Sequence, residues 1–70
     1  MQKLNLARIK ELRKKRKYSQ ADMAEVLGLS SMWIYHRKER GDQSFTAEEL
    51  NALMKFFEKD HEYFFENVVA

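Results

Sequence analysis

The sequence has no cysteine and no proline, and its 70 residues include only two glycines, Gly28 and Gly41. Without cysteine there is no disulfide framework, no thiolate metal cluster and no thiol nucleophile, so the core has to form by apolar packing. The commonest residues are good helix formers such as Leu, Lys, Glu and Ala. This composition predicts helices, and no strands are expected.

The chain also lacks long apolar runs. No stretch reaches the roughly 18 apolar residues that cross a bilayer or the roughly 7–15 of a signal-peptide core. We therefore expect a protein of the reducing cytosol. Its length predicts one domain, residues 1–70, with a core that leaves only about 3–5 kcal/mol of stability.

The net charge of +2 conceals a division along the chain. Residues 1–41 carry eleven Lys and Arg against four Asp and Glu, a net charge of +7. Residues 42–70 carry two against seven, a net charge of −5. A basic half of this strength is typical of a surface that binds a polyanion. A solvated lysine-rich helix face would give the same count, so charge alone leaves both interpretations open.

Hydrophobic spacing and capping residues predict the first two helices. Apolar residues at helical spacing indicate a helix from about Asn5 to Lys15. Ser19 can cap the next helix, Gln20–Leu27, with Asp22 completing a capping box, and Gly28 can end it in the left-handed conformation.

Three further helices follow from the same signals. Ser30 is the expected cap of a third helix, from about Ser31 to Lys38 or Glu39, with Ile34 as its clearest core residue. A capping box at Thr46 and Glu49 begins a fourth helix. A cap at Asp60 begins a short last helix that includes Tyr63, Phe64 and Phe65.

The second and third helices have the spacing of a helix-turn-helix, over about residues 19–39. A tight turn makes the two helices cross steeply. Such a crossing needs a small residue, a glycine with positive φ, an apolar plug and an apolar anchor. The candidates for these four positions are Ala24, Gly28, Leu29 and Ile34.

With these residues the sequence resembles the Cro/CI-type (XRE-like) helix-turn-helix repressor family, whose pattern is Thr/Ser-Gln, Ala, Gly-Val-Ser and a buried Ile. The matching residues are Ser19-Gln20, Ala24, Gly28-Leu29-Ser30 and Ile34. The resemblance covers nearly the whole chain. It implies an all-α, lambda-repressor-like bundle of about five short helices and a sequence-specific transcriptional regulator. We expect the switch protein of a phage, acting in a bacterial host.

The resemblance also implies how the protein contacts double-stranded operator DNA. The third helix would enter the major groove, with base edges contacted by Ser31, Met32, Tyr35 and His36. Gln20 would contact a phosphate, with Trp33 and Arg37 beside the DNA backbone. Salt-dependent affinity would come from the basic residues Arg13, Lys14, Arg16, Lys17, Arg37, Lys38 and Arg40.

Two features depart from the family pattern. The stretch from Ile34 to Gly41 is one residue longer than usual. Met32, Trp33 and Tyr35 replace the polar residues that make bidentate base contacts. This apolar surface favours an alternative function, in which a protein-binding modulator or antirepressor captures a partner repressor through these three residues. Trp33 could instead pack onto Phe45 or the fourth helix as ordinary core.

The C-terminal part is rich in apolar residues, more than one core of this size readily hides. We expect some of them to form a weak homodimer interface. The alternative is that they complete the core beneath the first and fourth helices. The residues concerned are Phe56, Phe57, Tyr63, Phe64, Phe65, Val68 and Val69.

Catalytic and metal-binding patterns are weak. His36 and His61 are far apart, and neither has a second ligand at helical spacing. The hydroxyl and carboxylate residues that could join a triad are already explained as helix caps. An enzyme, a metal site or a cofactor is therefore not expected.

Overall fold

Side-chain caps place most helix starts where the sequence predicts them. In the computed structural model, which describes residues 1–68, Asn5, Ser19, Thr46 and Asp60 each accept a hydrogen bond from the backbone N–H three residues further on. Both predicted capping boxes are confirmed. The helices are α1 (Leu6–Lys15), α2 (Gln20–Val26), α3 (Met32–Arg40), α4 (Ala47–Phe57) and α5 (His61–Phe64).

The third helix begins and ends later than predicted. Ser31, not Ser30, is the N-cap residue of α3, and its side chain makes no capping hydrogen bond. The helix continues to Arg40 and ends at Gly41, whose φ of 90° lies in the left-handed region that glycine adopts most readily. The one residue by which this sequence is longer than the family pattern therefore lies in the turn before α3.

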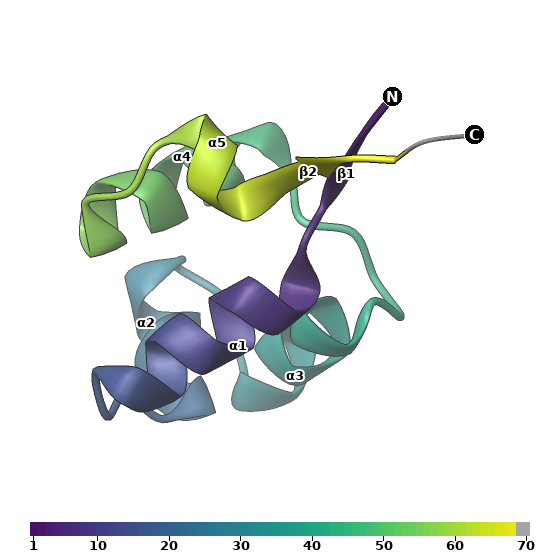
Figure 1. The fold of residues 1–70 in the computed structure, drawn as a ribbon. Helices are drawn as coiled ribbons and strands as arrows, with labels where there is room; N and C mark the ends of the chain where they lie inside the picture. The colour runs from purple at the N-terminus through teal and green to yellow at the C-terminus, as the bar shows by residue number, and fades with distance from the viewer. Residues whose placement is uncertain (69–70) are drawn as a thin grey trace.

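The expectation of no strands is wrong at the two ends of the described chain. Strands β1 (Gln2–Leu4) and β2 (Phe65–Asn67) pair antiparallel, so the predicted last helix ends before Phe65. The backbone N–H of Val68 extends the ladder by donating to the carbonyl of Met1 over 2.8 Å. Figure 1 shows the two ends side by side. This two-stranded β1–β2 ribbon is small beside the five helices, and the predicted all-α class is confirmed.

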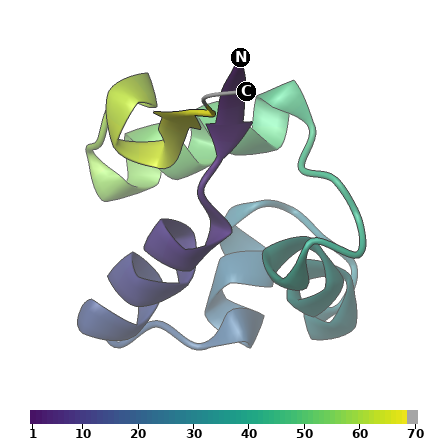
Figure 2. The same cartoon turned by 45° about the vertical axis from the view of Figure 1, so that its right-hand side comes forward.

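The elements form two layers. Helices α1, α2 and α3 make up one layer, and α4, α5 and the β1–β2 ribbon lie over it (Figure 1), an arrangement that persists in the rotated view of Figure 2. The core lies between the layers, and every helix contributes to it. Its buried residues are Ile9, Leu12, Met23, Ala24, Tyr35, Leu53, Phe57 and Phe64.

Tyr35, rather than Ile34, anchors α3 in this core. Ile34 is only half-buried, whereas Tyr35 has no exposed surface. A buried tyrosine needs a partner for its hydroxyl, and Glu39, one turn later, accepts that hydrogen bond at 2.6 Å. With Tyr35 as the anchor, the spacing to Gly41 is no longer one residue too long for the family pattern.

Part of the aromatic C-terminal segment completes this core. Phe57 and Phe64 are buried, whereas Phe56 and Phe65 are half-buried. Val68 is 39% exposed. Val69, the last apolar residue assigned to a dimer interface, lies outside the described residues. Within residues 1–68, no helix has the length and apolar character needed to cross a membrane.

Candidate nucleic-acid interface

The turn between α2 and α3 has the residues that the sequence predicts for it. Gly28 adopts a φ of 70°, and Ala24 is buried where the two helices approach each other. Leu29 packs against the core, and its backbone N–H donates to the Ala24 carbonyl at 2.8 Å. The turn therefore holds α2 and α3 as a helix-turn-helix.

A buried carboxylate fixes α3 against the first two helices. Glu39 receives two hydrogen bonds from Arg13 of α1, from Nε at 2.9 Å and from Nη2 at 3.0 Å. It also accepts from the Tyr35 hydroxyl and from Gln20 Nε2 of α2, the latter at 3.3 Å. A carboxylate has about four acceptor positions, so this one is fully satisfied. Arg13 additionally donates to the carbonyl of Tyr18 at 2.9 Å.

The surroundings of this network keep Glu39 ionised. Burial alone would raise its pKa, but hydrogen bonds from Arg13 and Tyr35 outweigh burial and hold the pKa below the ordinary value of 4.5. The hydrogen bond to Glu39 raises the pKa of Arg13. Burial, followed by the hydrogen bond to Glu39, raises the pKa of Tyr35. The network therefore holds one cation and one anion in contact.

A second buried pair joins α3 to α4. Lys38 Nζ lies 2.8 Å from Glu49 Oε1 and donates to the Ser44 carbonyl at 2.9 Å. The same Glu49 closes the capping box with Thr46. Burial would raise the pKa of Glu49, but the hydrogen bonds from Lys38 and Thr46 lower it overall. The start of α4 is thus tied directly to α3.

The outer face of α3 carries exposed residues along its length. Trp33 is 61% exposed, and its ring meets His36 edge to face with 5.8 Å between centroids. Ser31 and Arg37 are exposed, and Met32 is half-buried. Trp33 is therefore a surface residue, and its interpretation as core packed on Phe45 is wrong.

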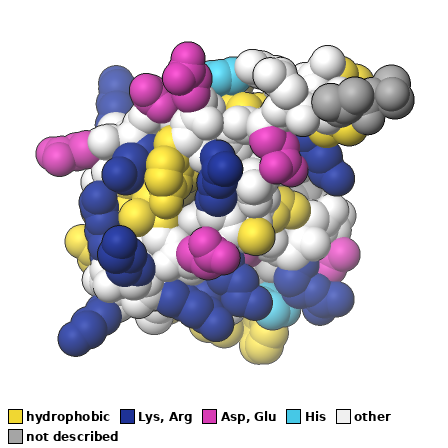
Figure 3. All heavy atoms as spheres, viewed as in Figure 1, with side chains coloured by type: hydrophobic (Ala, Val, Ile, Leu, Met, Phe, Trp, Pro, Cys, Tyr) yellow, Lys and Arg dark blue, Asp and Glu magenta, His cyan; other side chains and the backbone are white. Residues whose placement is uncertain are grey.

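Exposed basic side chains belong to the same layer as this face. The end of α1 and the turn after it present the exposed residues Lys14, Lys15, Arg16 and Lys17, and α3 ends at the exposed Arg40. Figure 3 shows Lys and Arg gathered over the α1–α3 layer, with a histidine and a hydrophobic group protruding at its lower edge. The predicted separation of charge along the chain is thus a separation in space.

Three residues predicted at the DNA surface are buried instead. Tyr35 has no exposed surface and cannot contact a base edge. Arg13 and Lys38 are only 7% and 4% exposed, and carboxylates of the same chain neutralise them. Burial of an unpaired charge is costly, so these two side chains have no freedom to reach a phosphate.

Two residues of the site escaped the sequence analysis. Lys15 belongs to the same exposed basic run as its neighbours. Glu39 organises the interface from beneath, and its i, i+4 spacing from Tyr35 was the only local signal for this role. Its pairing with Arg13 spans 26 residues, which no local pattern indicates.

The comparison with known protein families agrees with this geometry. A helix-turn-helix family model of the XRE type matches residues 9–64. The chain belongs to this helix-turn-helix family. An XRE-type helix-turn-helix protein is a DNA-binding transcription regulator, and the resemblance inferred from the sequence is confirmed at that level. No curated protein sequence and no solved structure gives a significant match to this helix-turn-helix protein.

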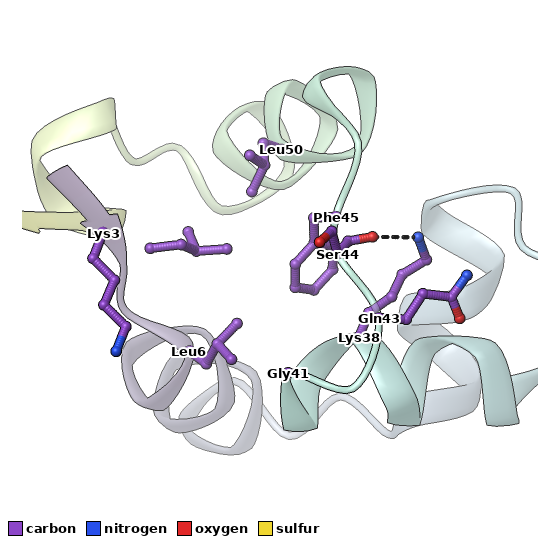
Figure 4. Close-up of a pocket in the computed structure, with 9 residues that line it drawn as sticks. Lys3, Leu6, Lys38, Gly41, Gln43, Ser44, Phe45 and Leu50 are labelled. Atoms are coloured by element: carbon purple, nitrogen blue, oxygen red, sulfur yellow. Dashed lines mark hydrogen bonds between the residues drawn. The ribbon is translucent and has the colours of Figure 1, made fainter. Parts of the chain in front are cut away.

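The helix-turn-helix protein also has a cavity of about 340 Å³ between β1, the loop after α3 and α4. Figure 4 shows Leu6, Phe45 and Leu50 pointing into it, with Lys3 beside it. None of the residues that line it belongs to the exposed face of α3. In the part of the chain that the structure describes, no group of His, Cys, Asp or Glu is arranged to hold a metal ion.

Proposed function

We propose that this protein is a sequence-specific operator-binding regulator that inserts α3 into the DNA major groove. The main support is the contrast between the two faces of α3. Tyr35 and Glu39 lock one face against α1 and α2, whereas the other face carries the exposed Trp33, and exposed cations stand at the ends of α1 and α3 in the same layer (Figure 1). The major groove of B-DNA is wide enough to admit such a helix.

The proposed base contacts come from residues at the start of α3 and from His36 one turn later, of which Met32 and His36 are half-buried. Met32 contacts a thymine methyl group, and Trp33 packs beside it along the DNA backbone. Arg37, which is exposed, is proposed to lie beside the DNA backbone and to donate to a phosphate. Ser31 and His36 complete the set of residues proposed to face the bases.

The proposed phosphate contacts surround this face. Gln20 is the first residue of α2 and is half-buried, and its side-chain amide is bonded to Glu39 and His36, so its backbone N–H is the group proposed to face a phosphate. The remaining phosphate contacts are assigned to the exposed cations Lys14, Lys15, Arg16, Lys17 and Arg40. Each neutralised phosphate releases counterions, so affinity should fall steeply as salt is raised.

The first experiment is a fluorescence titration of Trp33, the only tryptophan, with DNA from the gene's own promoter region. It is run at about 50 mM and about 200 mM salt, a range in which phosphate contacts lose much of their affinity. We expect tight, salt-sensitive binding that scrambled DNA does not reproduce. Equal affinity for scrambled DNA would contradict operator reading.

The charge-reversed double variant Lys14→Glu and Lys15→Glu tests the basic row. We expect it to lose most of its DNA affinity and to flatten the salt dependence by roughly 0.9 in log–log slope for each lost phosphate contact. Lys55→Glu is the matched control, because Lys55 is exposed in the last turn of α4 as the two lysines are in that of α1. Equal losses in both proteins would contradict the proposed interface.

A second candidate function rests on the exposure of Trp33 itself. An exposed tryptophan beside Met32 is typical of a hot spot for a protein partner. In this alternative the protein captures a partner repressor through Met32 and Trp33. Trp33→Ala would then abolish the complex, whereas reversal of Lys14 and Lys15 would leave it nearly unchanged. A Trp33 signal that responds only to the partner and not to DNA would favour this alternative.

The assembly and the genetic setting are proposed from the same resemblance. We propose a weak homodimer through the half-buried Phe56 and Phe65 and the exposed Val68, because repressors of this type bind half-sites about 34 Å apart as dimers. Sedimentation at increasing concentration tests it, and a constant monomer mass would contradict it. The proposed setting is a Cro-type phage switch, which a divergently transcribed second repressor gene would support.

A further inference from the structure

We propose that the buried Glu39 carboxylate acts through Gln20 to fix the tautomer of His36, so that the ring offers DNA a hydrogen-bond acceptor. His36 would then be a specificity-determining residue, and Glu39 and Gln20 positioning residues behind it. The DNA part of this inference rests on the proposed operator-binding function. The tautomer itself can be measured in the free protein.

The chain of hydrogen bonds starts at an anion. Glu39 accepts two hydrogen bonds from Arg13 and one from Tyr35, and it has no proton to donate while it is ionised. The amide of Gln20 lies against it, with Nε2 3.3 Å from Glu39 Oε1. Only the NH₂ group of the amide can face an acceptor, so the charge on Glu39 sets the orientation of the amide.

The orientation of Gln20 then decides where the His36 proton sits. With Nε2 directed at Glu39, the amide oxygen of Gln20 faces His36 Nδ1 at 3.2 Å. An amide oxygen can only accept, so Nδ1 must carry the proton. A neutral imidazole has only one N–H group. If Nδ1 carries the proton in order to donate to Gln20, Nε2 has none. His36 Nε2 is left as an acceptor.

This acceptor is open to a ligand. Among the described residues, every fully buried side-chain nitrogen or oxygen has a hydrogen-bond partner. The hydrogen bond of the half-buried His36 ring is at Nδ1. Nε2 is therefore in contact with solvent, on the same ring that meets the exposed Trp33 edge to face.

The chemistry of an acceptor restricts what His36 can bind in the major groove. Adenine N6 and cytosine N4 are donors and can pair with it, whereas guanine presents only the acceptors N7 and O6. A phosphate oxygen is also an acceptor. The neutral ring therefore favours adenine N6 or cytosine N4 over the major-groove edge of guanine or a phosphate.

Long-range ¹H–¹⁵N NMR of the imidazole nitrogens tests the tautomer without DNA. The spectrum is recorded on the whole chain at about pH 8, above the ordinary histidine pKa of roughly 6.5. We expect His36 to be protonated at Nδ1. His61 is the internal control, because its ring stacks on Phe65 at 4.1 Å and is exposed. A His36 pattern with the proton on Nε2 would overturn the proposal.

The variant Gln20→Met removes the amide and keeps the length of the side chain. We expect the His36 pattern to shift away from the Nδ1-protonated form, while that of His61 stays the same. An unchanged His36 pattern in this variant would overturn the proposed coupling. An unchanged amide spectrum for α1 and α4 would show that the fold persists.

Operator variants test the consequence for sequence reading. At the base contacted by His36 we expect the wild-type protein to prefer adenine or cytosine over guanine by about 2- to 12-fold, the value of a single hydrogen bond. Gln20→Met and His36→Ala should reduce this preference to a similar extent, even where overall affinity also falls. Full discrimination in Gln20→Met would overturn the specificity role. If the wild-type protein binds no operator at all, the proposed function is overturned. The tautomer measured by NMR in the free protein is independent of that result.

Discussion

Arg13 and Glu39 show how a charge in a basic run becomes part of a core. Arg13 stands at the start of five consecutive cations, yet its neighbours remain exposed while its own guanidinium forms a two-pronged contact with a buried carboxylate. A guanidinium fork matches a carboxylate in a way that lysine cannot, so the two arginines of this run are the residues suited to burial, and of these Arg13 is the one that meets Glu39.

Removal of one partner of this pair should destabilise the protein strongly. We expect Arg13→Met or Glu39→Met to lower the free energy of unfolding by about 3–5 kcal/mol, because each leaves a buried charge unpaired. The double variant should lose less than the sum of the two. Because this loss equals the whole stability expected for a chain of this size, circular dichroism without urea should show both single variants largely unfolded, and urea denaturation measures the double variant.

The control for this prediction is a surface pair of similar composition. Arg40 lies 3.5 Å from Asp42, and both side chains are more than half exposed. We expect Arg40→Met to cost less than about 1 kcal/mol. Equal costs for Arg13→Met and Arg40→Met would contradict the importance of burial.

Glu39 and Glu49 make the stability depend on pH. The pKa of each lies below the ordinary carboxyl value of 4.5 in the folded state, so the unfolded chain binds more protons in acid. The stability that these two carboxylates contribute is fully present above the ordinary carboxyl pKa. It is lost as the pH falls through their lower pKa in the folded state. We expect the urea concentration at the midpoint of unfolding to decrease when the pH is lowered below about 4.5. The decrease should be smaller in the double variant Lys38→Met and Glu49→Gln.

At the scale of the helix, local signals predicted most boundaries. The capping boxes at Ser19 and Thr46 involve residues three apart, so a short stretch of sequence is enough to identify them. The sequence could not give the register of α3. Whether Ile34 or Tyr35 turns inward depends on Glu39, and Glu39 is fixed by Arg13 on another helix.

Two N-cap serines allow a comparison within the same protein. Ser19 accepts a hydrogen bond from the backbone N–H of Asp22, whereas the side chain of Ser31 makes no capping hydrogen bond. We expect Ser19→Ala to cost about 1 kcal/mol of stability and Ser31→Ala clearly less. Thermal unfolding of both variants measures the difference, and a larger loss for Ser31→Ala would contradict this assignment.

At the scale of the whole molecule, the sequence predicted the division of charge but not the closure of the fold. The basic first half forms the α1–α3 layer, and most of the acidic second half lies above it (Figure 3). The β1–β2 ribbon and the cavity next to it depend on contacts between distant parts of the chain. Asn5 and Glu66, which share a side-chain hydrogen bond, are 61 residues apart.

The ribbon should be the least protected part of the backbone in hydrogen exchange. Its strands have three residues each and mostly exposed side chains, so little apolar burial opposes their opening. We expect the amides of β1 and β2 to exchange faster than those of Ile9 and Leu53 in the core. Slower exchange in the ribbon than in α1 would contradict this prediction.

The pairing of β1 with β2 also has a consequence for the order of folding. It closes a loop that contains all five described helices, and the entropy of closing a loop grows only slowly with its length, as about (3/2)RT ln n. Most of that cost has already been met once the helices have packed, because Leu4 and Phe65 are then held close together. The ribbon should therefore form last, and sequence changes in it should alter the unfolding rate rather than the folding rate.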